Sequence, residues 1–193
     1  MNELALTLRG ACAFLVLALA PLLPAGVAHA TAYRSLDLDQ RLELAVDVFV
    51  GRVTAVEGER RGDEPWTVVS FSVDAWLLRD GTVNETGPFE VSLAFLGGSA
   101  TGVAARQVAG FPTFTVGERA LLATYGDEVE SASPLVGVTQ GLWRELDGVW
   151  RDEAGEAMAV DASGRPTLAA EGAPEDDWFA SLLERLRELR DTQ

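Results

Sequence analysis

The chain has 193 residues, a formal net charge of −15, one cysteine and one histidine. This length fits one domain, and all 15 basic residues are arginine. Cys12 and His29 both lie within the first 30 residues, so removal of that segment excludes Cys or His catalysis, a zinc site built on either, and a disulfide. The negative charge disfavours nucleic acid as a partner, because phosphate binding needs clustered basic side chains.

The first 30 residues have the pattern of a cleavable secretory signal. A basic residue precedes an apolar run that starts at Ala11, and the run before Pro21 is shorter than the roughly 20 residues of a membrane helix. Residues 28–30 match the small-x-small sequence that signal peptidase cuts. We therefore expect a signal peptide at 1–30, cleavage after Ala30, a secreted or periplasmic bacterial protein, and no stable membrane insertion afterwards.

The first half of the expected mature chain predicts one short helix followed by strands. Ser35 is the expected helix cap, and apolar residues recur at helical spacing as far as Ala45. The pattern then alternates, as in β-strands, and Gly51 suggests a bulge or a close backbone approach. The expected strands are residues 48–53, 69–77 and 89–95, with a turn at 79–81. Trp76 is offset from the apolar face of its strand, so we expect it to point outward, toward a partner or a packed helix.

Residues 97–112 predict a long loop, because they hold four glycines and no sustained apolar period. The glycines permit positive φ or close packing, and Pro112 fixes φ where the chain returns to the sheet. Loops of this length are often functional, so a structural connection and a binding surface are both open interpretations. The candidate partner-binding residues are Gly97, Gly98, Gly102, Gly110, Phe111, Pro112 and Trp76.

The second half predicts further strands and a final amphipathic helix. The expected strands are residues 120–125, 135–139 and 142–146, then a hairpin arm at 149–150 and 158–160 with a turn at 161–164. The helix begins near Pro174, with acidic residues in its first turn and arginines near its end. Its apolar stripe predicts packing on the sheet, and partner binding is the alternative. The stripe consists of Trp178, Phe179, Leu182, Leu183, Leu186 and Leu189.

Three stretches carry a resemblance to a protein family: GGSATG at 97–102, VAGFPTF at 108–114 and VGERALL at 116–122. Their spacing resembles a group of uncharacterised bacterial exported proteins, whose pattern is GG, G and then V-x-G-x-P-x-F-x-x-G-E before an apolar strand. The sequences VFVGRV at 48–53 and VGVTQGL at 136–142 resemble that group's first and last core strands.

The resemblance implies a mainly β fold, with a small closed β-barrel similar to an OB-fold and distantly to the barrel of tissue metalloprotease inhibitors. We therefore expect a barrel domain at 31–146, on which a hairpin and the C-terminal helix at 147–193 pack. Some members are encoded near exported metalloproteases, which suggests a protease as partner. Those inhibitors chelate zinc through an N-terminal cysteine, whereas Thr31 would stand first here, so zinc chelation is not expected.

No constellation of residues predicts catalysis. Ser99 lies in a glycine-rich stretch, but Thr101 replaces the second glycine of a nucleophile elbow and the mature chain has no histidine to activate the serine. Four clustered acidic residues could in principle hydrolyse glycosides or bind calcium, and five tryptophans could stack on sugars. The acidic residues are Asp147, Asp152, Glu153 and Glu156, and the tryptophans are Trp66, Trp76, Trp143, Trp150 and Trp178.

We therefore expect no catalytic residues, no cofactor and no metal. The favoured function is a non-enzymatic exported binding or adaptor module, with an exported protease or another envelope protein as partner. The alternatives are a carboxylate-dependent carbohydrate-active enzyme and a structural envelope protein. An enzyme of that kind needs two carboxylates that converge in one concave pocket, whereas a binding module needs none.

Overall fold

The computed structural model describes residues 34–126 and 131–192. The expected signal peptide, its cleavage site and Thr31 lie outside these residues. Neither helix in the described part is long and apolar enough to cross a membrane. The elements are α2 (Leu38–Leu44), β1 (Asp47–Arg61), β2 (Glu64–Arg79), β3 (Thr82–Val83), β4 (Glu90–Leu96), β5 (Arg119–Thr124), β6 (Leu142–Leu146), β7 (Val149–Asp152), β8 (Ala157–Val160), β9 (Pro166–Ala169) and α3 (Glu175–Asp191).

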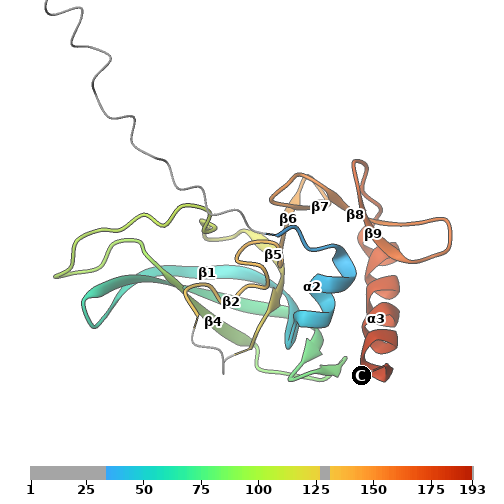
Figure 1. Cartoon of the computed structure of the whole chain (residues 1–193), viewed down its shortest axis with the longest axis horizontal. Helices are drawn as coiled ribbons and strands as arrows, with labels where there is room; N and C mark the ends of the chain where they lie inside the picture. Colours follow the sequence, from blue (N-terminus) through green and yellow to red (C-terminus); the bar gives the residue numbers. More distant parts are fainter. Residues whose placement is uncertain (1–33, 127–130, 193) are drawn as a thin grey trace, which may run out of the picture. The chain divides into compact units, whose positions relative to one another are not determined.

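The fold is mainly β, as predicted, but the sheet is open and the expected closed barrel is wrong (Figure 1). Neighbouring strands follow the order β3-β2-β1-β5-β6-β7-β8-β9, all antiparallel, and β4 pairs with β2. The end strands of the described sheet do not pair with each other, since β4 pairs with β2 and β9 pairs with β8. A backbone hydrogen bond of 2.8 Å from Leu96 N–H to the carbonyl of Ala132 joins the end of β4 to the segment before β6.

The first part of β1, residues 48–51, and most of β5 are buried on both faces, which explains the nearly continuous apolar sequence of these two segments. Successive side chains of a strand point to opposite faces, so the two strands contribute to two separate apolar clusters. The first cluster holds Val48, Val50, Leu121 and Ala123, and the second holds Phe49, Val53, Ala120 and Leu122.

Helices α2 and α3 cover the first cluster and lie side by side (Figure 1). Helix α3 contributes the buried part of its predicted stripe, Trp178, Leu182, Leu186 and Leu189. The second cluster lies between β1, β2, β4 and β5 and is completed by Phe111 and Phe114 from the long loop. The loop therefore serves as part of the core as well as a connection.

Several local predictions need correction. The cap of α2 is Asp37 rather than Ser35, because Asp37 and Gln40 form a reciprocal capping box. The expected strand at 135–139 is a turn, since Gly137 and Val138 have φ angles of 59° and 70°, which a strand does not adopt. The short strands β3 and β9 were not predicted. Of the two features expected at Gly51, the close backbone approach is confirmed, because a β-carbon there would lie 3.0 Å from the carbonyl oxygen of Ser72; the extra residue of the adjacent bulge lies on β2.

A buried ion pair joins α2 to the β7–β8 turn. Arg41 Nη1 lies 2.9 Å from Asp152 Oδ2, and the two side chains are only 5% and 3% exposed. Arg41 also donates to the carbonyls of Leu36 and Gln140. The second oxygen of Asp152 accepts the amides of Ala154 and Glu156. Each charge is thus surrounded by hydrogen-bond partners, as a buried ion pair requires.

We expect Asp152→Ala to lower the free energy of unfolding by about 3–5 kcal/mol, because it leaves the Arg41 charge buried without its partner. The exposed pair of Arg60 and Asp63 supplies the matched control, and Asp63→Ala should cost less than about 1 kcal/mol. Urea denaturation followed by tryptophan fluorescence measures both values. Equal losses in the two variants would contradict this account of the buried pair.

Helices α2 and α3 are also joined by Asp39 and Arg185, through bonds of 2.8 Å and 2.5 Å. The hydrogen bond from Arg185 holds the pKa of Asp39 below its usual value of 3.8. A carboxyl whose pKa is lowered by folding stabilises the fold above its unfolded pKa, and that stability is lost as the pH falls through the folded pKa.

Asp39→Asn should therefore be less stable than the wild type at pH 7, by less than about 1 kcal/mol because the Asp39 carboxylate is partly solvated. The difference should shrink as the pH falls below 3.8. Denaturation curves of both proteins from pH 7 to pH 2.5 make the comparison. A difference that stays constant over this range would show that the ionised Asp39 does not contribute.

Candidate functional site

The long loop leaves β4 at Gly97 and Gly98, where the backbone passes very close to the sheet. All four predicted loop glycines have positive φ, as their positions suggested: 105° at Gly97, 101° at Gly98, 83° at Gly102 and 81° at Gly110. A β-carbon on Gly98 would collide with the hydroxyl of Thr67, and one on Gly97 would lie 2.9 Å from the carbonyl of Arg106. Glycine is therefore required at 97 and 98 for two reasons: a β-carbon would collide with neighbouring atoms, and the positive φ angles disfavour other residues.

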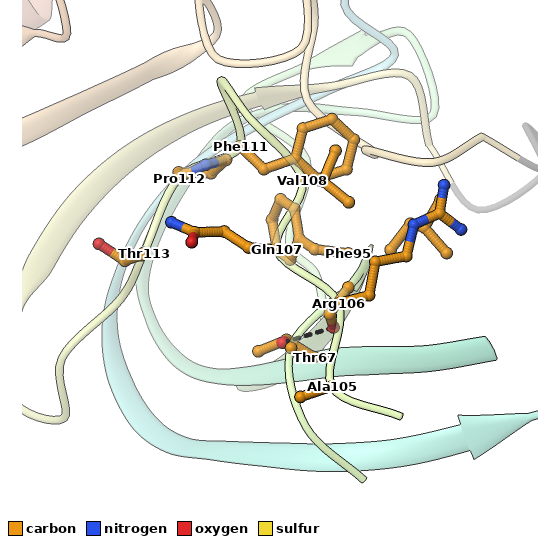
Figure 2. A pocket seen from close by; sticks show the side chains of 12 residues that line it. Thr67, Phe95, Ala105, Arg106, Gln107, Val108, Phe111, Pro112 and Thr113 are labelled. Carbon is orange, nitrogen blue, oxygen red and sulfur yellow. Dashed lines mark hydrogen bonds between the residues drawn. The ribbon is translucent and has the colours of Figure 1, made fainter. Parts of the chain in front are cut away.

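The start of the loop is held by backbone hydrogen bonds. Gly98 and Arg106 exchange both of their amide-to-carbonyl bonds, at 2.7 Å and 2.9 Å, in a short antiparallel bridge. Thr67 Oγ1 donates to the carbonyl of Gly97 at 3.0 Å (Figure 2). The Arg106 side chain pairs with Glu64 at 2.5 Å, and both side chains are half exposed.

The return of the loop to β5 is held by Glu118 and Arg144. Glu118 accepts the amide of Thr115 at 3.0 Å and bonds to Arg144 at 2.5 Å. Arg144 also donates to the carbonyl of Thr113 and lies 5.4 Å from the ring centre of Phe114. The glutamate of the family-like motif thus anchors the loop, and its carboxylate is engaged by the protein itself.

Between these two anchors, the loop and the end of β4 enclose an open cavity of about 380 Å³. Its apolar wall consists of Phe95, Val108, Phe111 and Pro112, and the first three side chains lie close together (Figure 2). The complete lining is Thr67, Phe95, Leu96, Gly97, Gly98, Ala105, Arg106, Gln107, Val108, Phe111, Pro112 and Thr113.

Four of the seven predicted contact residues line this cavity: Gly97, Gly98, Phe111 and Pro112. Gly102 and Gly110 belong to the same loop but are not part of the lining. Phe95 belongs to the alternating apolar residues of the strand predicted at 89–95. That alternation could have identified it as a residue on the same face as the cavity. Thr67 precedes the predicted part of β2 and gave no such signal.

Trp76 lies elsewhere, and its predicted outward orientation is wrong. The pairing of Val50 with Ala75 and of Gly51 with Val73 leaves Asp74 as an extra residue in β2. This bulge reverses the alternation, so Trp76 packs against Phe49 at a ring distance of 5.1 Å. Its indole N–H donates to the carbonyl of Pro88, and Arg79 lies 5.5 Å from the ring centre.

Other candidates for chemistry are occupied by structural contacts. Trp143, Trp150 and Trp178 are completely buried in the core, so five tryptophans do not form a sugar platform. Asp152 pairs with Arg41, and Glu153 pairs with Arg144. Over residues 34–126 and 131–192, no group of three or more His, Cys, Asp or Glu side chains could hold a metal ion.

A larger cavity of about 510 Å³ lies between α2 and β9, and four carboxyl groups line it. Asp37 caps α2 and Asp39 bonds to Arg185. The hydroxyl of Ser163 and the amides of Arg165 and Ser163 lower the pKa of Asp161. A general acid needs a raised pKa, whereas the pKa values of Asp39 and Asp161 are lowered. Glu156 is the fourth carboxyl group of the lining.

Comparison of the chain with protein-family models, with curated proteins and with solved structures finds no match. The class of protein therefore rests on the fold and the cavity alone. The described chain is a mainly β protein with one open antiparallel sheet, and a glycine-anchored loop forms a cavity with an apolar wall at the end of β4.

We expect Gly98→Ala to destabilise the protein more than Gly117→Ala. Both glycines have similar φ angles, 101° and 92°, but a β-carbon on Gly117 would meet nothing within 4 Å. The shared backbone strain costs about 1–2 kcal/mol, and the collision with Thr67 should add roughly 1–3 kcal/mol. Denaturation measures the difference, and hydrogen exchange of the Arg106 amide shows whether the bridge opens. Equal losses would contradict a space requirement at Gly98.

Proposed function

We propose that the protein is a non-enzymatic binding or adaptor module that is exported and holds a protein partner with its 97–112 loop. The favoured partner is an exported protease. The observation that carries the proposal is the open cavity at this loop, which combines a wall of Phe95, Val108, Phe111 and Pro112 with extended backbone. Apolar cavities with a few polar groups at their rim are the usual form of a binding site.

The lining of the cavity supports binding rather than catalysis. Among the described residues around it there is no carboxylate, serine, cysteine or histidine, and its one charged side chain is Arg106. Thr67 and Thr113 are the hydroxyl groups of the lining, and a threonine nucleophile needs an adjacent base to activate it; Thr67 donates its hydrogen bond to the carbonyl of Gly97 instead. The arrangement instead offers apolar surface and hydrogen bonds, which hold a partner without changing it.

The backbone hydrogen bonds of Arg106 argue against one mode of protease binding, in which the loop would enter the active site like a substrate. A substrate-like inhibitor lies extended in the protease and gives the carbonyl before the scissile bond to the group that polarises it, which is an oxyanion hole or, in a metalloprotease, the metal ion. The amide and carbonyl of Arg106 are both bonded to Gly98. Arg106 therefore cannot enter a protease in that way without breaking the bridge, and the proposal is for contact through the cavity.

The test is a pull-down from the exported fraction of the organism that encodes the chain, analysed by mass spectrometry. Three baits are compared: the full chain, its Phe111→Ala variant and its Phe89→Ala variant. Phe89 is 86% exposed and does not line the cavity, so it is the matched aromatic control. We expect an exported protease to be captured by the full chain and by Phe89→Ala, with at least a tenfold loss in Phe111→Ala, since buried aromatic anchors dominate binding.

The captured protease is then purified and assayed with and without the full chain, which separates an inhibitor from an adaptor. Thermal denaturation of each bait shows that Phe111→Ala is folded. Capture of the same proteins in equal amounts by all three baits would contradict binding through the loop. Absence of any exported protease from the specific set would overturn the protease as partner.

A further inference from the structure

One edge of the loop has backbone groups without partners in the described protein. Arg106 directs its amide and carbonyl toward Gly98. In an extended chain the neighbouring residues direct theirs to the opposite side. Those neighbours are Ala105 and Gln107, which are exposed and form no backbone hydrogen bond within residues 34–126 and 131–192. Their free edge resembles the edge of a sheet that can take another strand.

The same two residues line the cavity, so the free edge and the apolar wall belong to one site. A strand placed along Ala105 and Gln107 would have alternate side chains on one face, next to Phe95 and Phe111. A cavity of about 380 Å³ is near the lower limit of roughly 300–1,000 Å³ for small-molecule sites. It therefore suits one large apolar side chain with its flanking backbone rather than a helix.

The charge of Arg106 indicates which residue type would lie next to the apolar side chain in the added strand. Arg106 and Gln107 extend to opposite sides of the segment (Figure 2), so a neighbouring residue of the added strand would face Arg106. Arg106 is the one charged residue in this lining, whereas two other cavities of the described chain contain several carboxylates. Arg106 bonds to Glu64 through Nη1, and a guanidinium has five N–H donors, so it can bind a second carboxylate.

We infer that the 105–107 edge binds an extended segment of a partner protein by strand addition. The segment places a large apolar side chain in the cavity and an adjacent Asp or Glu beside Arg106. This inference deepens the proposed function and rests on it, since it names the chemistry that the loop recognises. Main-chain hydrogen bonds give such complexes their affinity, and the side-chain pocket gives their specificity.

The experiment titrates the isotope-labelled full chain with the acetylated peptide Thr-Val-Phe-Glu-Val-Thr, and amide chemical shifts are recorded by NMR. We expect saturable shifts at Ala105 and Gln107 and around Phe95 and Phe111. Replacement of the peptide Phe by Ser should weaken binding about tenfold, and replacement of Glu by Lys about threefold. Shifts confined to another strand edge, or none at millimolar peptide, would overturn the inference.

Two further comparisons distinguish strand addition from simple apolar contact. Two versions of the peptide are compared, each N-methylated on one of the two alternating sets of residues. Their affinities should differ by at least tenfold, because the backbone amides of one set face the 105–107 edge and those of the other set face solvent. Equal affinities would overturn strand addition. Gln107→Pro should abolish binding while Gln107→Ala retains it, because only proline removes the amide; if Gln107→Pro does not fold, the methylated peptides decide.

The outcome is independent of the pull-down. A protease captured through Phe111, together with a peptide that leaves Ala105 and Gln107 unchanged, would remove the strand-addition inference and leave the proposed function in place. A peptide bound at the edge without a captured protease would retain the inference and overturn the protease as partner. Failure of both would remove the loop as a binding site.

Discussion

Burial on both faces of β5 and of the first part of β1 is the constraint on which the rest of the structure depends. Each strand contributes apolar side chains to both clusters, so a single sheet cannot satisfy them without a cover on each side. Helices α2 and α3 provide the first cover. The second cover comes from β2 and β4 and is completed by Phe111 and Phe114 of the loop. The loop is therefore bound to the core at those two positions, in addition to the glycines and the Glu118–Arg144 pair that fix its ends.

The side chain of Arg119 joins β2, β6 and α3 to one another. It donates to Asp74 of β2, to Glu145 of β6 and to Glu175 at the start of α3, and it lies 5.0 Å from the ring centre of Trp150. The hydrogen bond to Glu175, together with those to the other carboxylates, raises the pKa of Arg119. Its charge is thus retained at any accessible pH, and without it three carboxylates from three elements would be left close together.

The sequence patterns correctly predict the elements that have a clear apolar periodicity. They do not predict the places where a single extra residue changes the face on which the following side chains lie. The apolar stripe of α3, the strands of the core and the positive φ of the loop glycines all followed from local spacing. The bulge at Asp74 has no local signal, because it depends on pairing with β1, and it moved Trp76 to the other face. The prediction of a closed barrel failed for a similar reason: whether the end strands of a sheet pair with each other is decided by tertiary contact, which alternation does not encode.

The cavity lies where the sheet is open. Among the described strands β4 pairs only with β2, and the loop covers the apolar residues near its end. The glycines hold that loop against the sheet at one end, and Glu118 with Arg144 holds it at the other. Two fixed ends with an extended middle leave space beneath Val108 and Phe111 and leave the 105–107 edge without a strand. The features that would recognise a partner thus lie together at the end of β4, the strand whose described strand pairing is with β2 alone.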